Sequence, residues 1–258
     1  MEILAVAVLG FFAVGYFVLG GADIGTGMIL PLLGRDTRER RLVVAAIAPF
    51  FLGNEVWLVA IIGILAGAFP ALEATLMHDL FPAFVTLAAG WTVRDMGLWL
   101  RGRVDSRVWR ALCDTSIVAG SWAVALSWGT VFASVLAGAT DRAVIGPAAI
   151  LGTLAVAALF AAHGLAFAAL RLSGPLRKRA RRLSGPIREA PLLAMTSAAL
   201  MVLCLGAGAR LSPAEATADP ATLAFLLPPL LVTTPLLVAA QTWVWWIFRH
   251  RVTQPTYL

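Results

Sequence analysis

Charged residues are scarce in this chain of 258 residues: Asp, Glu, Lys and Arg make up only 13% of it, while hydrophobic residues make up 60%. With a mean hydropathy of +0.87, this composition excludes an ordinary soluble domain, a secreted disulfide scaffold and a disordered chain. The two cysteines, Cys113 and Cys204, have no C-x-x-C partner for metal or redox chemistry. The composition therefore indicates a protein of the lipid bilayer.

Apolar stretches long enough to cross a hydrocarbon core, about 20 residues as a helix, recur along the chain. They predict an all-α, polytopic membrane bundle of about seven helices, in a single transmembrane domain over residues 1–258 without a separate soluble domain. The predicted spans are residues 3–34, 42–70, 78–100, 113–140, 143–170, 190–209 and 221–248. The first is longer than a bilayer requires, and the glycines around Asp23 favour a break there. The N-terminal residues lack the basic region of a signal peptide, so we expect the first span to stay in the mature protein.

Basic residues fall almost entirely into alternate loops. Seventeen of the 20 Lys and Arg residues follow the first, third, fifth and seventh predicted spans, whereas the loops after the second, fourth and sixth hold only Arg142 and Arg210. Because positively charged short loops stay on the cytoplasmic side, this pattern predicts an outside N-terminus and a cytoplasmic C-terminus. Contact with anionic membrane lipid accounts for the net charge of +6, so no nucleic acid partner is expected.

The few ionisable residues inside the predicted spans carry most of the functional information, because each is costly there unless it is paired or hydrated. In the predicted topology all of them lie between the bilayer midplane and the cytoplasmic face, which is typical of a proton-entry route. They are Asp23, Glu55, Arg94, Asp95 and His163.

Each of these residues also has a structural interpretation. Asp23 can cap the second half of a broken helix. Glu55 has no nearby Lys or Arg in its own helix, which favours a functional or inter-subunit contact over a buried structural hydrogen bond. Arg94 either snorkels to the inner interface or pairs with Asp23 or Glu55. Arg94 and Asp95 are neighbours on different helix faces, so we do not expect them to pair with each other.

His163 and Trp57 leave further alternatives open. His163 is an axial haem ligand, a proton relay or a packed core histidine, and the lack of a second ligand at similar depth disfavours haem. Trp57 lies deep in its predicted span, where tryptophan usually packs against partner helices; a ring beside a quinone or haem is the alternative.

Four motifs occur along the chain: GADIGTGM at residues 21–28, GNEVWL at 53–58, His163-Gly164 ahead of the basic loop, and WWIFR at 245–249. Their order and spacing resemble subunit II of cytochrome bd-type quinol oxidases. The first hundred residues carry most of the specificity, and pieces of the resemblance extend to the C-terminus.

This resemblance implies a multi-pass subunit of a respiratory terminal oxidase in the bacterial cytoplasmic (inner) membrane, a complex that oxidises quinol and reduces O2 to water. Haem b and haem d are then expected in the partner, subunit I, which this chain stabilises, and a structural quinone is a further expected ligand. No catalytic residue, metal ligand or directly bound haem is assigned to this chain. Asp23 and Glu55 are expected in a cytosolic proton path, with Asn54 orienting Glu55.

The remaining candidate site residues are expected to support this path by polar contacts or packing. They are Arg94, Asp95, Trp57 and His163.

The sequence departs from the family in two places. Phe51-Leu52 stand where the family commonly has an aromatic residue and an aspartate, so Leu52 replaces an acid often assigned to proton transfer. One helix is also missing before the last span, because the family usually has eight helices and this chain has about seven. Membrane lipid and a small accessory subunit are the candidates for its place.

The alternative function is a stand-alone membrane carrier or channel that uses Asp23, Glu55 and Arg94.

Overall fold

The computed structural model describes residues 1–139 and 144–254, and throughout these residues the regular structure is helical, without a β-strand. In chain order the elements are α1 (Glu2–Met28), α2 (Leu30–Leu33), α3 (Thr37–Ile47), α4 (Phe51–Ala68), α5 (Pro70–Asp79), α6 (Phe81–Leu100), α7 (Arg107–Leu136), α8 (Pro147–Arg171), α9 (Gly174–Leu183), α10 (Glu189–Arg210), the 3-10 helix η1 (Pro213–Ala216) and α11 (Pro220–Ile247). The predicted all-α fold is therefore confirmed.

Six of the described helices are long and apolar enough to cross a membrane: α1, α4, α7, α8, α10 and α11. A seventh span is formed if α5 and α6 are taken together, although the pair is bent by 86°. The prediction of about seven spans agrees with this number. Arg142, at the junction of the fourth and fifth predicted spans, lies outside the described residues.

The predicted break at Asp23 is wrong. Helix α1 continues through the glycines and ends at Met28; a single residue, Ile29, separates it from α2, which begins at Leu30. In a bilayer no water competes for the backbone, so a glycine-rich stretch keeps its intrahelical hydrogen bonds. Pro31 has no N–H to donate and its ring clashes with the carbonyl four residues before it, which explains where the helix ends.

The predicted span 42–70 is wrong at its start. Residues 37–47 form the separate helix α3, and the membrane helix α4 begins only at Phe51. Pro49 lies between them and cannot donate the backbone hydrogen bond that would continue α3. The third span likewise begins at Phe81 rather than at residue 78, because His78 and Asp79 end α5.

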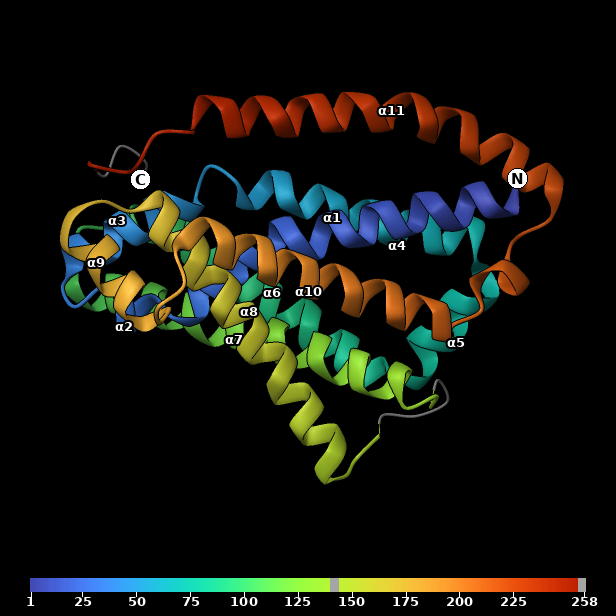
Figure 1. Ribbon diagram of the computed structural model, residues 1–258, viewed down its shortest axis with the longest axis horizontal. Helices are drawn as coiled ribbons and strands as arrows, with labels where there is room; N and C mark the ends of the chain where they lie inside the picture. Colours follow the sequence, from blue (N-terminus) through green and yellow to red (C-terminus); the bar gives the residue numbers. More distant parts are fainter. Residues whose placement is uncertain (140–143, 255–258) are drawn as a thin grey trace.

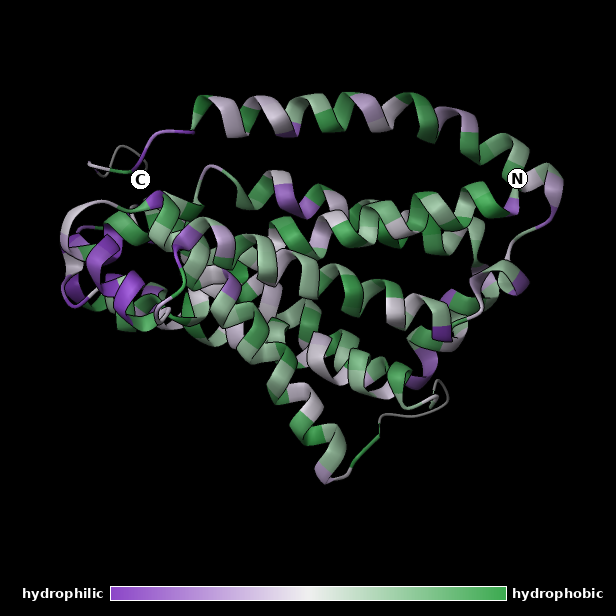
Figure 2. Cartoon of the chain, in the orientation of Figure 1, coloured by the Kyte–Doolittle hydropathy of each residue, from purple (hydrophilic) through white to green (hydrophobic). Residues whose placement is uncertain are grey.

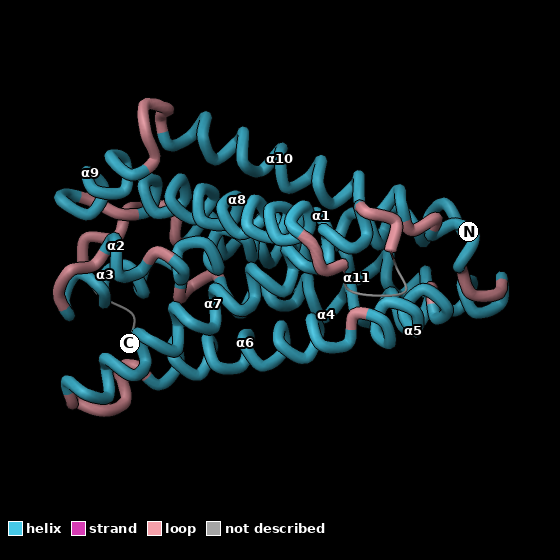
Figure 3. The backbone as a smooth tube through the Cα atoms, turned by 90° about the horizontal axis from the view of Figure 1, so that it is seen from below, coloured by secondary structure: helices cyan, strands magenta, loops and turns pink. Residues whose placement is uncertain are grey.

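Helix α1 lies at the centre of the bundle and packs against α4, α7, α8 and α10, while α6 packs along α7 (Figures 1 and 3). At the crossing of α1 and α8 the two backbones touch: a Cβ added to Gly25 would lie 1.8 Å from the Phe160 carbonyl oxygen. Gly164 faces Gly25 from the other helix. Small residues thus permit the close helix packing that is typical of membrane bundles.

Helix α11 lies apart from the bundle (Figure 1), and only 11% of its most hydrophobic stretch is buried. At its C-terminal end the chain is tied to α8: the Val252 N–H donates to the Arg171 carbonyl at 2.8 Å, and Arg171 donates in turn to the carbonyl oxygens of Phe248 and His250. The end of α11 is therefore held by hydrogen bonds from the Val252 backbone and the Arg171 side chain, together with the Trp245 ring, which packs against Phe50 and Phe167.

Hydrophilic residues gather at the end of the molecule that contains α2, α3 and α9, as Figure 2 shows. Arg101 bonds Asp114 at 2.5 Å, and Arg179 bonds Glu39 at 2.7 Å. The Arg179 guanidinium and the Arg35 backbone N–H hold the pKa of Glu39 below its usual range. The basic loops thus share one end of the bundle, as the charge pattern requires, and the cytoplasmic location of that end remains a prediction.

Candidate functional site

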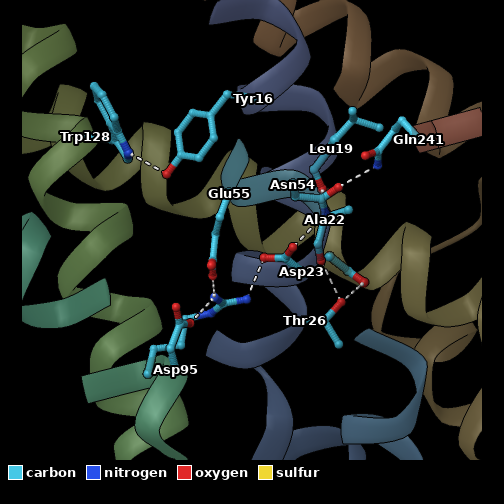
Figure 4. A network of polar contacts seen from close by, with 12 residues as sticks. Tyr16, Leu19, Ala22, Asp23, Thr26, Asn54, Glu55, Asp95, Trp128 and Gln241 are labelled. Carbon is cyan, nitrogen blue, oxygen red and sulfur yellow. Dashed lines mark hydrogen bonds and ion pairs between the residues drawn. The ribbon is translucent and has the colours of Figure 1, made fainter. Parts of the chain in front are cut away.

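A buried ion pair joins α1 and α6 in the middle of the bundle. Arg94 Nη2 lies 2.6 Å from Asp23 Oδ1, and the two side chains are 2% and 4% exposed. The second carboxylate oxygen of Asp23 accepts a hydrogen bond from Asn54 Nδ2 at 2.7 Å, so both oxygens have a charged or polar partner (Figure 4). Pairing and hydrogen bonding together are what make buried charges tolerable.

Two further carboxyl groups face the same guanidinium. Arg94 Nη1 lies 2.8 Å from Asp95 Oδ1 and 3.7 Å from Glu55 Oε1, and the Asp95 and Glu55 side chains are each 16% exposed. We call Asp23, Glu55, Arg94 and Asp95 the acidic centre. Three acids around one arginine provide several sites that can hold or pass a proton.

A small internal space of about 10 Å³ adjoins the acidic centre, lined by Glu55, Arg94 and Trp91 among others. This volume is about what one water molecule needs. Within the described residues, Glu55 Oε1, Arg94 Nε and Trp91 Nε1 are buried without a hydrogen-bond partner. The Phe51 ring, 6.0 Å from Arg94 Cζ, covers the guanidinium.

The structure decides between the alternatives for Arg94 and Asp23. Arg94 pairs with Asp23 and Glu55 instead of snorkelling to the interface. Asp23 lies inside a continuous helix, so it does not cap a broken one. The expectation that Arg94 and Asp95 do not pair is wrong, because the long arginine side chain folds back far enough to reach its neighbour.

Asn54 does not hydrogen-bond Glu55. Its amide donates to Asp23 and to the Leu19 carbonyl, at 2.7 and 3.0 Å, and its oxygen accepts from Gln241 Nε2 at 2.9 Å. Successive residues of a helix point in different directions, which separates the Asn54 amide from the Glu55 carboxyl group. Asn54 therefore orients Asp23 rather than Glu55.

His163 is a packed residue with both ring nitrogens in hydrogen bonds. Nδ1 lies 2.7 Å from Thr196 Oγ1 and Nε2 lies 2.9 Å from the Val18 carbonyl oxygen. A ring protonated at Nε2 donates to the Val18 carbonyl, and Nδ1 then faces the Thr196 hydroxyl, whose single proton also reaches the Leu192 carbonyl oxygen at 2.8 Å. This arrangement does not fit an axial haem ligand, which needs a free nitrogen lone pair. Among the described residues no group of three His, Cys, Asp or Glu side chains is suited to a metal ion.

Trp57 and Leu52 lie on α4 but outside the acidic centre. The Trp57 ring packs directly on Gly15 and against Phe11 and Phe12. Its buried Nε1 lacks a partner in the described part of the chain, and its ring lines an apolar cavity of about 530 Å³ beside α1. Leu52 is 45% exposed on α4, one turn before Glu55, so it lies beside the acidic centre and supplies no carboxyl group there.

The sequence pattern did not single out Gln241 or the buried Arg101–Asp114 pair. Gln241 is uncharged, so a search for ionisable residues does not find it, although a glutamine within an apolar span is itself an unusual residue. Asp114 lies near the start of α7, where the predicted span boundary placed it at the interface.

Comparison with known proteins identifies the family. Residues 1–213 match the family model described as cytochrome bd terminal oxidase subunit II. The cytochrome bd-I ubiquinol oxidase subunit 2 of Escherichia coli is 33% identical over 130 residues, which are 50% of this chain and 34% of that protein. The cytochrome bd ubiquinol oxidase subunit 2 of Bacillus subtilis is 33% identical over 171 residues, 62% of this chain and 51% of its own length. A protein of Haemophilus influenzae described as a probable cytochrome oxidase subunit 2 is 33% identical over 125 residues, 48% of this chain and 33% of its own length.

The chain thus spans between a third and about half of the length of the curated relatives that it matches. The match agrees with the predicted multi-pass location in a bacterial cytoplasmic membrane, and it includes every residue of the acidic centre. By this match over most of its length, the chain belongs to the cytochrome bd terminal oxidase subunit II family.

Proposed function

We propose that this chain is the non-haem subunit II of a cytochrome bd-type terminal oxidase, a complex that oxidises quinol and reduces O2 to water. The family match over residues 1–213 is the observation that carries the proposal. Haem b and haem d belong to the partner, subunit I, where they supply the electron transfer and oxygen chemistry. The bonded nitrogens of His163 support a chain that holds no haem itself.

The outer surface of α4 and α6 supports a role in stabilising the partner subunit. Large apolar side chains there are 43–58% exposed, and they lie on the two helices that also supply Glu55 and Arg94. They are Leu52, Val56, Val59, Val93 and Met96. Such a surface requires either lipid or another membrane subunit to cover it.

The acidic centre is the proposed proton path of this subunit. Intramembrane carboxyl groups that face one another and partly reach the surface are typical of proton relays. The Asp23 side chain is only 4% exposed, whereas those of Glu55 and Asp95 are each 16% exposed, so these two partly exposed acids form the entry to the centre in this proposal. Leu52 replaces the usual acid of the family outside this centre, so the path proceeds without it.

The substitution Glu55→Gln tests the proton path. We expect it to lower quinol oxidase turnover and proton uptake by about tenfold or more, because an amide cannot exchange a proton with Asp95 or Asp23. Steady-state oxygen consumption and proton uptake in vesicles measure the effect. Glu215→Gln is the matched control, since Glu215 is exposed in η1, away from the acidic centre. Wild-type turnover and proton uptake in Glu55→Gln would contradict the proposed proton path and indicate that the acids have a purely structural role.

A structural quinone fits the cavity beside Trp57. This cavity of about 530 Å³ is lined by the Trp57 ring, by apolar residues of α1 and by Leu205 of α10, which suits an isoprenoid tail. The quinone would be a bound lipid-like group here, with no part of the reaction assigned to it.

A mild-detergent pull-down of the tagged chain from its native membrane tests the whole proposal. We expect the eluate to contain a haem-bearing membrane subunit, a reduced-minus-oxidised spectrum with haem b and haem d bands, quinol oxidase activity and extractable quinone. A haem-free eluate without that partner would refute the oxidase assignment. The carrier alternative, which uses Asp23, Glu55 and Arg94, loses the support of a broken helix at Asp23, because α1 is continuous there.

A further inference from the structure

Gln241 is a buried polar residue on the least buried membrane helix. Only 11% of the most hydrophobic stretch of α11 is buried, yet Gln241 is just 7% exposed. The buried residues of α11 are Leu223, Leu227 and Gln241. Because a buried amide without a hydrogen-bond partner destabilises the folded protein, a glutamine at such a position needs a partner. A polar contact therefore joins α11 to the bundle at this point.

The contact gives both ends of the Asn54 amide a hydrogen-bond partner. Gln241 Nε2 donates to Asn54 Oδ1 at 2.9 Å, while Asn54 Nδ2 donates to the Leu19 carbonyl and to Asp23 Oδ2 at 3.0 and 2.7 Å (Figure 4). If the Asn54 amide were reversed, its oxygen would face two other acceptors and its NH2 group would face a donor. The Leu19 carbonyl and the Asp23 carboxylate thus fix which way the Asn54 amide faces, and the Gln241 donor adds a third contact that holds the amide there.

The surroundings of Gln241 allow this close approach. Gly53 precedes Asn54, and a Cβ at Gly53 would lie 3.2 Å from Gln241 Oε1, closer than ordinary contact. Gln241 also lies beyond residues 1–213, whereas Asn54, Asp23 and Arg94 lie within this family-matched segment. Helix α11 thus adds one polar group to a centre whose other members come from the first hundred residues.

We propose that Gln241 is a positioning residue for the acidic centre. Its amide holds Asn54 so that Asn54 donates to Asp23, and this contact makes α11 part of the acidic centre. The effect on Asp23 can be measured without oxidase turnover; only its consequence for proton uptake rests on the proposed function.

Infrared spectroscopy of the purified full chain, with 13C-labelled aspartate, tests the proposal. Asp23→Asn identifies the band of the Asp23 carboxyl group. Gln241→Met removes the donor at nearly constant volume, and we expect it to shift this band in the same direction as Asn54→Leu. The effects of the Gln241 and Asn54 substitutions should not add, because both act through one hydrogen bond. Thr242→Val is the matched control, since the exposed Thr242 hydroxyl donates to the Val238 carbonyl of its own helix.

Gly53→Ala provides a second variant that keeps the glutamine. The added methyl group presses on Gln241 Oε1, so we expect a smaller shift of the Asp23 band in the same direction. An Asp23 band that keeps its wild-type position in both Gln241→Met and Gly53→Ala overturns the proposal. A pull-down without a haem-bearing partner would refute the oxidase assignment, but the position of the Asp23 infrared band could still be measured. Failure of the proposed function is therefore distinguishable from failure of the Gln241 proposal.

Discussion

Replacing Arg94 by methionine is expected to lower the free energy of unfolding by about 3–5 kcal/mol, because it leaves the buried carboxylate of Asp23 without its charged partner. Arg94 contacts all three acids of the acidic centre, and its side chain is only 2% exposed. Thermal unfolding of the purified chain in mild detergent measures the loss. Arg103→Met is the matched control, since Arg103 lies exposed after α6.

The double substitution Asp23→Leu with Arg94→Met checks the cause. When both members of a buried ion pair are replaced by apolar groups, most of the cost of the single change is recovered. We therefore expect the double variant to be more stable than Arg94→Met alone. Stability losses that simply add, or an Arg94→Met variant that unfolds at the wild-type temperature, would show that the pair does not hold α1 to α6.

Replacing Gly25 by alanine is expected to separate α1 from α8 and to destabilise the bundle by about 3 kcal/mol or more. The added Cβ would lie 1.8 Å from the Phe160 carbonyl oxygen, and a backbone atom cannot move aside as a flexible side chain can. The yield of monodisperse protein and its melting temperature measure the effect.

Gly10→Ala is the control for this substitution because it lies on the same helix. Its added Cβ would meet only the Leu205 side chain, at 4.0 Å, which is ordinary contact. Equal melting temperatures for the Gly25 and Gly10 variants would contradict a backbone-to-backbone crossing at Gly25.

The sequence predicted the helical fold and the number of spans because both depend on the length and hydropathy of the apolar segments. A segment that crosses a bilayer must be long and apolar enough, and it must satisfy its backbone hydrogen bonds internally. It predicted helix ends less well. The glycines around Asp23 would weaken a helix in water, but in the membrane α1 continues to Met28, and prolines, not glycines, explain the interruptions near Pro31 and Pro49.

The members of the acidic centre were predicted from their cost in a membrane, whereas their contacts were not. The depth of a residue in the membrane follows from its position along a span. The direction in which its side chain points depends on how each helix is rotated about its own axis, which a single sequence does not show. The Asp23–Arg94 pair was therefore one of several alternatives until the structure placed both side chains. Gln241 was missed because it carries no charge.

The weak attachment of α11 also bears on the order in which the protein is made. Helices α1, α4 and α6 precede α11 in the chain, so the Asp23–Arg94 pair and its Asn54 contact can form while the ribosome is still synthesising the later residues. At that stage the Asn54 side-chain oxygen does not yet accept the hydrogen bond from Gln241. Docking of α11 is then a late step of biogenesis, completed when Val252 reaches the backbone of Arg171 at the end of α8.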